Sequence, residues 1–181
     1  MKKLFYLLPI LSILMASCES GPKTYTYNGI SFTLPKGYEV TDVHEDDDYE
    51  AYVFLIEEKK NDLNFMILTI AAMEDGSCES MTTDEIIQFE QDRAYGELDD
   101  LMDQEDFSFV TEPTQDVFYL NDGKDPFFVV FYEGRDSSGE FIGRIVSCTM
   151  ADIDATATIY GETQEDVDKL IDCFSSLRIQ P

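Results

Sequence analysis

The chain has 181 residues, enough for one domain with a full hydrophobic core and too few for two domains of ordinary size. Hydrophobic residues make up 44% and aromatic residues 13%, a composition that folds and is not typical of disorder. The formal net charge of −26 argues against nucleic acid as a partner. It favours cations or basic partner surfaces, or it simply keeps the domain soluble.

The first 18 residues follow the pattern of an export signal. Two lysines and an apolar run over 4–15 are followed by two small residues and Cys18. The run is too short to cross a bilayer as a mature helix. Residues 14–18 (Leu-Met-Ala-Ser-Cys) resemble the lipobox of bacterial lipoproteins, with Met in place of the usual Leu. The resemblance implies lipid transfer to Cys18 and removal of residues 1–17; the alternative is an ordinary secretory leader cut near Ala16.

A lipid on Cys18 predicts a protein anchored to a membrane of the bacterial cell envelope, outside the cytoplasm. Acyl chains give this anchorage without a transmembrane helix. Residues 18–23 then form a short tether, and residues 24–181 form the single globular domain. The two lysines of the leader are lost, so ten basic residues remain against 38 acidic ones, and the formal charge becomes −28.

The first half of the domain is expected to form strands and then one helix. A hairpin is expected at Asn28-Gly29, the strongest short turn signal, and 35–37 (Pro-Lys-Gly) ends its second strand. A helix is expected over 82–104, capped by Thr82 or Thr83. The expected strands are 24–27, 30–34, 49–58 and 63–73. Ile86, Phe89, Arg93 and Leu98 are expected near one face of the helix, with Leu101 and Met102 beyond.

The second half is expected to form further strands and a closing helix. The last helix starts at Thr163. Links of hairpin length indicate a largely antiparallel sheet, and helices packed on such a sheet make the fold α+β. The expected strands are 107–110, 117–120, 127–133, 141–150 and 155–160. The apolar stripe of the closing helix contains Val167, Leu170, Ile171, Phe174 and Leu177.

Two segments resemble PsbP-like domains, the superfamily of PsbP and Mog. One is 29–38 (Gly-Ile-Ser-Phe-Thr-Leu-Pro-Lys-Gly-Tyr), and the other is the strand 155–160 with its glycine and a helix closing on 174–179 (Phe-Ser-Ser-Leu-Arg-Ile). The resemblance implies an α-β-α sandwich, with a mid-chain helix and a C-terminal helix packed on a largely antiparallel sheet. It also implies a binding or assembly role, because members share no catalytic set.

The residues that most enzyme mechanisms need are missing. His44 is the only histidine, and its acidic neighbours favour a solvated loop residue. There is no G-x-S-x-G elbow for a Ser-His-Asp triad and no glycine-rich phosphate loop. One histidine and scattered cysteines also argue against zinc. We therefore expect no enzyme activity and no catalytic residues.

One acidic run is a candidate cation site. Glu45, Asp46, Asp47 and Asp48 cluster hard oxygen ligands in an expected loop, as Ca²⁺ prefers. The alternative is a solvated run of charge without a ligand. No other cofactor is expected.

Besides Cys18 the chain has three cysteines, an odd number, so at least one thiol stays free or pairs elsewhere. Export permits disulfides. Cys148 shares a strand face with Val146, and Cys173 flanks the stripe of the closing helix. A disulfide between Cys148 and Cys173 is therefore a hypothesis, with buried free thiols as the alternative.

These observations favour an envelope-anchored lipoprotein that acts as a non-enzymatic binding or assembly module for an envelope protein. The alternative is a lipoprotein that binds a small ligand or a divalent cation. In that case a pocket between sheet and helix, with Tyr and Phe as walls, would hold the ligand. A deep cleft with buried acids would instead favour an enzyme.

Overall fold

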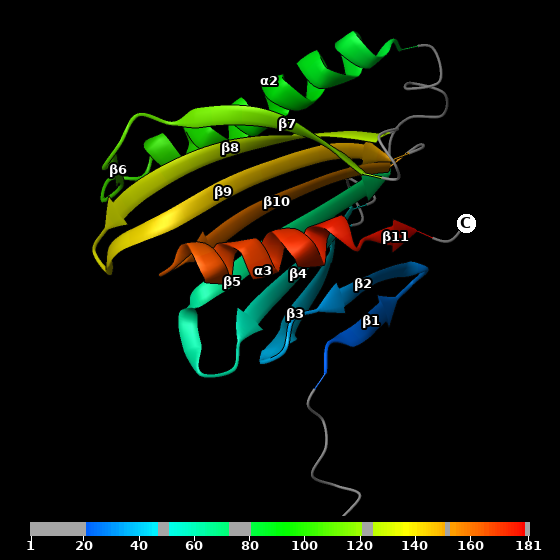
Figure 1. Ribbon diagram of the computed structural model, residues 1–181, viewed down its shortest axis with the longest axis horizontal. Coiled ribbons are helices and arrows are strands. Elements are labelled where there is room, and N and C mark those ends of the chain that lie inside the picture. The colour runs from blue at the N-terminus through cyan, green and yellow to red at the C-terminus, as the bar shows by residue number, and fades with distance from the viewer. Residues whose placement is uncertain (1–20, 47–50, 73–80, 121–124, 151–152, 180–181) are drawn as a thin grey trace, which may run out of the picture.

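The computed structural model describes residues 21–46, 51–72, 81–120, 125–150 and 153–179. An eight-stranded antiparallel sheet forms its centre, in the order β3-β4-β5-β10-β9-β8-β6, and β7 also pairs with β8 (Figure 1). Its strands are β3 (Tyr38–Asp46), β4 (Ala51–Glu58), β5 (Asn61–Ala72), β6 (Ser108–Phe109), β7 (Thr114–Leu120), β8 (Asp125–Asp136), β9 (Gly139–Met150) and β10 (Ile153–Gly161).

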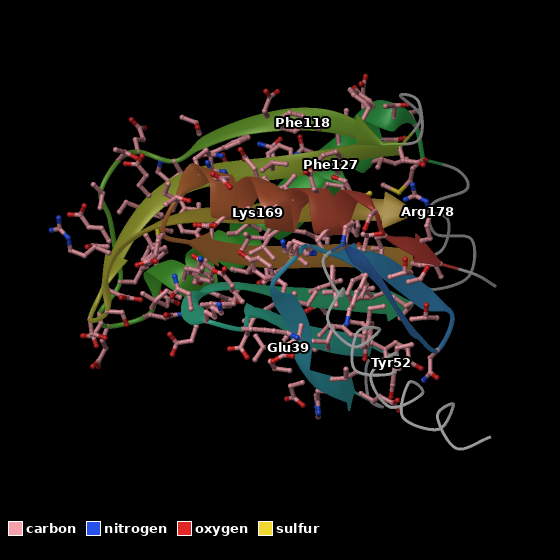
Figure 2. All side chains as sticks on the ribbon, turned by 60° about the horizontal axis from the view of Figure 1, so that its bottom comes forward. Glu39, Tyr52, Phe118, Phe127, Lys169 and Arg178 are labelled. Carbon is pink, nitrogen blue, oxygen red and sulfur yellow. The ribbon has the colours of Figure 1, made fainter. Side chains whose placement is uncertain are left out.

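One face of this sheet is covered by a helix and a small second sheet. The helix is α3 (Gln164–Ser175), and the small sheet has the order β1-β2-β11. Its strands are β1 (Lys23–Tyr27), β2 (Ile30–Leu34) and β11 (Arg178–Ile179). Figure 2 shows both in front of the main sheet. The apolar core beneath them includes Phe32, Phe54, Leu68, Val146, Ile159, Leu170 and Phe174.

The other face carries α2 (Thr83–Met102), which packs on β8 and β9. A second, smaller core lies beneath it, made by Ala94, Leu98, Leu101, Phe128, Val130, Tyr132 and Ile145. Beyond β9 this face is open enough that Leu63 and Ile67 of β5 are 42% and 39% exposed. The expected α-β-α sandwich is thus confirmed, with one outer layer narrower than the other.

Local signals in the sequence explain where the helices and the first hairpin begin. Thr82 and Glu85 form a capping box at the start of α2, and the Thr163 side chain caps α3. Asn28 and Gly29 have φ of 43° and 81°, the left-handed values of a tight hairpin turn. These three predictions are confirmed. No helix in the described ranges is long and apolar enough to span a membrane.

Two expectations are corrected by the structure. Residues 44–46 lie in β3 and not in a loop, because Val43 to Asp46 pair in register with β4. The buried face of α2 holds Glu90, Ala94, Leu98 and Leu101, whereas Phe89 is only partly buried. The helix turns Glu90 inward because hydroxyl groups of β9 meet its carboxylate.

Candidate functional site

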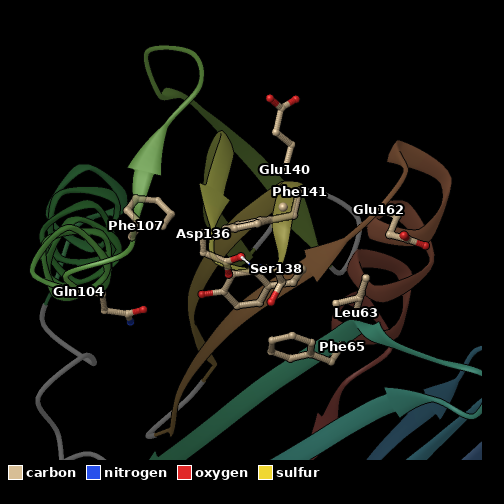
Figure 3. A pocket seen from close by; sticks show the side chains of 11 residues that line it. Leu63, Phe65, Gln104, Phe107, Asp136, Ser138, Glu140, Phe141 and Glu162 are labelled. Carbon is tan, nitrogen blue, oxygen red and sulfur yellow. Dashed lines mark hydrogen bonds between the residues drawn. The ribbon is translucent and has the colours of Figure 1, made fainter.

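A pocket of about 230 Å³ opens beside the C-terminal end of α2 (Figure 3). Four parts of the chain build it: the start of β5, the segment after α2, the β8–β9 hairpin and the end of β10. Its walls are the aromatic and apolar side chains of Leu63, Phe65, Phe107, Phe141 and Tyr160. The remaining lining residues are Gln104, Asp136, Ser138, Gly139, Glu140 and Glu162.

The aromatic walls form a continuous series of ring contacts. Phe65 stacks on Tyr160 with 4.6 Å between ring centroids, because β5 and β10 place these residues opposite each other. Tyr160 lies 5.1 Å from Phe141, and Phe141 lies 6.1 Å from Phe107. Such contacts fix ring orientations and contribute beyond area burial. The pocket is therefore held in shape by rings that support one another.

Two strand glycines make room for this series. A Cβ atom at Gly143 would lie 2.1 Å from the ring of Tyr132, its partner on β8. A Cβ atom at Gly134 would lie 2.6 Å from the ring of Phe141. Each glycine thus lets an aromatic ring lie flat across a neighbouring strand. Tyr132 in turn contacts Phe107 and Phe141 at 6.2 and 6.3 Å.

Three carboxylates surround the pocket, and no lysine or arginine lines it. Asp136 accepts a hydrogen bond from the Ser138 backbone N–H at 2.7 Å, which shapes the hairpin turn. Glu162 accepts one from the Asn61 side-chain amide at 2.5 Å. Glu140 is paired with Arg135. Among the described residues, Asp136 and Glu162 have no cationic partner.

The electrostatic surroundings of Tyr160 agree with this charge distribution. Burial is the main cause that raises the pKa of the Tyr160 hydroxyl, and the negative charges of Asp136 and Glu97 raise this pKa further.

A second polar group lies under α2, away from the pocket lining. Glu90 is completely buried, and its carboxylate accepts hydrogen bonds from the hydroxyls of Ser147 and Thr149 on β9. Arg93, one turn later, donates to the Thr156 hydroxyl at 2.9 Å and pairs with Asp154 on β10.

Neighbouring strands bring these four polar strand residues together, since Ser147 pairs with Thr156 and Thr149 with Asp154. Burial lowers the pKa of the Arg93 guanidinium. The group fixes α2 to the sheet. A covered carboxylate of this kind cannot reach a substrate.

The acidic candidates for calcium do not form a site within the described chain. Glu45 and Asp46 are the last two residues of β3. The Tyr27 hydroxyl donates to Glu45 at 2.5 Å. Asp47 and Asp48 lie outside the described residues. Within those residues, no group of three or more His, Cys, Asp or Glu could hold a metal ion. Calcium binding by this run stays a prediction.

The two cysteines considered for a disulfide are free and buried in the structure. Cys148 and Cys173 both lie in the core beneath α3, as their positions predicted, but as separate thiols. Burial raises the pKa of each thiol to about 12. Cys18, the predicted lipid site, lies outside the described residues.

A pocket with Tyr and Phe walls is present, but strand ends and the segment after α2 line it, not the sheet and a helix as the alternative hypothesis expected. Its residues were not predicted. Some of its wall residues are far apart in the sequence; Phe65 and Phe107, for example, are 42 residues apart. The pattern of a single sequence does not show that such residues are neighbours in space. The available signal was the pair of glycines within the aromatic-rich strands at 134 and 143. Glycine in a strand interior often marks close approach by another group.

Comparison with known proteins identifies the fold. No protein-family model and no curated protein matches the chain. The solution structure of cyanobacterial PsbP (CyanoP) from Synechocystis sp. PCC 6803 is similar, with a TM-score of 0.58 and 12% sequence identity over 91% of this chain and 96% of that chain. A crystal structure from Bacteroides thetaiotaomicron VPI-5482 gives a TM-score of 0.44 and 10% identity over 90% of this chain and 49% of that chain. The likeness to CyanoP confirms a PsbP-like α+β fold.

Proposed function

We propose that the protein is a lipoprotein of the bacterial cell envelope, anchored through Cys18, and that it is a non-enzymatic binding module. Its binding site is the aromatic pocket beside α2. The pocket carries the proposal, since it is a concave space with four aromatic walls and a few convergent polar groups. The lipobox-like segment 14–18 supports the anchor.

The lining of the pocket favours binding over chemistry. It includes no histidine, cysteine or lysine. His44, the only histidine of the chain, lies on β3 and is exposed. Ser138, the only serine of the lining, therefore has no histidine beside it to act as general base. The buried carboxylate of Glu90 is held by two hydroxyls under α2 and lines no part of the pocket.

The size of the pocket limits what it can hold. Its volume of about 230 Å³ lies below the ~300–1,000 Å³ of sites for drug-sized ligands. It therefore suits a small molecule or one side chain of a partner protein. Both occupants agree with a binding or assembly role.

The binding proposal is tested by NMR on the chain without its leader, which keeps every described residue. Benzyl alcohol and benzylamine are titrated, and shifts are followed at the pocket rings. We expect shifts at Phe65, Phe141 and Tyr160 that are lost in Phe141→Ala. They should remain in Phe118→Ala, which removes an exposed ring of β7. Shifts that are absent, or that are unchanged in Phe141→Ala, would contradict the proposal.

The anchor is tested separately by fractionation of cells that express the full chain. Cys18→Ala should move the protein from the membrane fraction to the soluble fraction, whereas Ser20→Ala should not. Retention of Cys18→Ala in the membrane fraction would overturn the lipoprotein assignment without affecting the pocket.

A further inference from the structure

We propose that the pocket selects a cationic group, an organic ammonium or guanidinium on a small apolar body. This inference rests on the proposed binding function and names the class of ligand. The shared chemistry has two possible sources, a free organic amine or an Arg or Lys side chain of a partner protein.

The first argument comes from the ring faces. The planes of Phe65 and Tyr160 differ by 25°, those of Tyr160 and Phe141 by 57°, and those of Phe141 and Phe107 by 43°. The rings therefore differ in tilt along the series and do not form one flat wall. Figure 3 shows Phe65, Phe107 and Phe141 among the side chains that line the pocket. The negative face of an aromatic ring attracts a cation within about 6 Å of its centroid. A compact cation here could meet several such faces.

The second argument comes from uncompensated charge. Asp136 and Glu162 reach the pocket from two different strand ends, and each is hydrogen-bonded only to a neutral donor. Arg135, the nearest cationic side chain in sequence, is exposed and paired with Glu140. A cation entering the pocket would therefore meet two carboxylates that no cation among the described residues neutralises.

The third argument compares a cation with an anion and with a neutral group of the same shape. An anion would meet three carboxylates and no cationic side chain among the lining residues, in a chain whose net charge is −26. A neutral group of the same shape would fill the space but would partly desolvate Asp136 and Glu162 without compensating their charge. The cation alone gains from both the rings and the carboxylates.

The test is calorimetric titration of the chain without its leader against matched probes. Choline is compared with 3,3-dimethylbutan-1-ol, its neutral carbon analogue. A Gly-Arg-Gly peptide is compared with Gly-citrulline-Gly. Each cation should bind at least about tenfold more tightly than its neutral partner. Binding of the cation should also weaken as salt is raised. Preference for choline indicates a free amine, and preference for the peptide indicates a partner side chain.

Conservative variants test which carboxylates cause the preference for a cation. Asp136→Asn and Glu162→Gln keep the acceptor oxygens for Ser138 and Asn61, so each should fold and weaken the cation about threefold to tenfold. Arg135→Gln frees Glu140 and should strengthen binding. Glu39→Gln is the matched control, because Glu39 is equally a surface acid but pairs with Lys59 elsewhere. It changes net charge by the same amount and should have no effect.

The outcomes separate the two proposals. Equal affinity for charged and neutral probes, with loss of both in Phe141→Leu, would overturn the cation preference and leave the pocket as a binding site. An equal effect of Glu39→Gln and Asp136→Asn would also overturn it, because net charge alone would then explain the binding. If none of the probes binds, charged or neutral, both proposals fail.

Discussion

The two faces of the main sheet differ in the side chains that they bury and in how completely they are covered. The α3 face is mostly apolar, with Arg144 as a buried charged side chain bonded to Gln164 of α3, and a helix and the β1-β2-β11 sheet cover it. The α2 face mixes apolar side chains with the Glu90 and Arg93 groups. Its helix packs mainly on β8 and β9, and Arg93 also bonds to β10. The first face uses its side chains to exclude water. The second leaves a pocket and exposed apolar residues beside α2, so the pocket and the larger core lie on different sides of one sheet.

The test with the largest expected effect compares two adjacent residues of β5. Leu68 is fully buried on the α3 face, and Ile67 points to the other face. We expect Leu68→Ala to lower the free energy of unfolding by about 2–5 kcal/mol, because it leaves a cavity in a packed core. Ile67→Ala should cost about 1 kcal/mol, since its side chain is already partly in water. Urea denaturation measures both, and equal losses would contradict the comparison.

A second test concerns the glycines behind the pocket. In Gly143→Ala the added methyl group would meet the Tyr132 ring, so we expect a loss of about 1–3 kcal/mol and displacement of the pocket rings. Gly96→Ala is the matched control. It lies in α2 with no atom near its Cβ position, and it should gain about 0.5–1 kcal/mol. A harmless Gly143→Ala would show that Tyr132 does not need this glycine.

A third test concerns the buried polar group under α2. Glu90→Ala leaves the Ser147 and Thr149 hydroxyls without their acceptor, and we expect it to cost about 1–3 kcal/mol in urea denaturation. Glu90→Leu combined with Ser147→Ala and Thr149→Val should recover part of this loss, because no buried polar atom then lacks its partner. If the combined variant is less stable than Glu90→Ala, the carboxylate does more than satisfy the two hydroxyls.

A fourth test concerns a dependence of stability on alkaline pH. The folded-state pKa of Cys148 and Cys173 is about 12, above the ordinary value of 9.0. Their stabilising contribution is full below pH 9 and is lost between pH 9 and 12, because the unfolded chain releases protons that the folded chain keeps. The expected slope is at most about 1.4 kcal/mol per pH unit for each thiol.

Two measurements check this prediction. The free energy of unfolding should fall from pH 9 to 10.5, and less so in a Cys148→Ala, Cys173→Ala variant. Iodoacetamide should label both residues only after unfolding, without a reductant. Failure of labelling in the unfolded, unreduced protein would favour a disulfide over the free thiols of the structure.

Much of the fold followed from local signals. Capping residues, the Asn28-Gly29 turn and the stripe of the closing helix act within a few positions, so their physics is visible along the chain. β3 escaped prediction because it is an acidic edge strand whose register shifts between Val40 and Asp42, which breaks the alternation of period two. β11 also escaped prediction, because its two residues are too few to show an alternating pattern.

The site was harder to predict for a physical reason. The inward turn of Glu90 depends on hydroxyls 57 and 59 residues later in the chain. Without those partners a glutamate is expected in water, and the sequence pattern placed Phe89 inside. The pocket walls likewise meet only after the sheet has set its register. Periodicity along the sequence indicates which face a residue takes, and it does not indicate the neighbours across that face.

The small sheet also has a mechanical consequence. β2 pairs with both the first and the last strand of the described chain, so β1 is an edge strand whose ladder bonds all go to β2. A pull through the residues before Lys23 would load this five-residue ladder first. Because β11 holds β2 from the other side, β1 can peel away while α3 and the main sheet stay folded. If the chain is anchored through Cys18 as proposed, the released β1 would then act as an extensible link between that anchor and the rest of the domain.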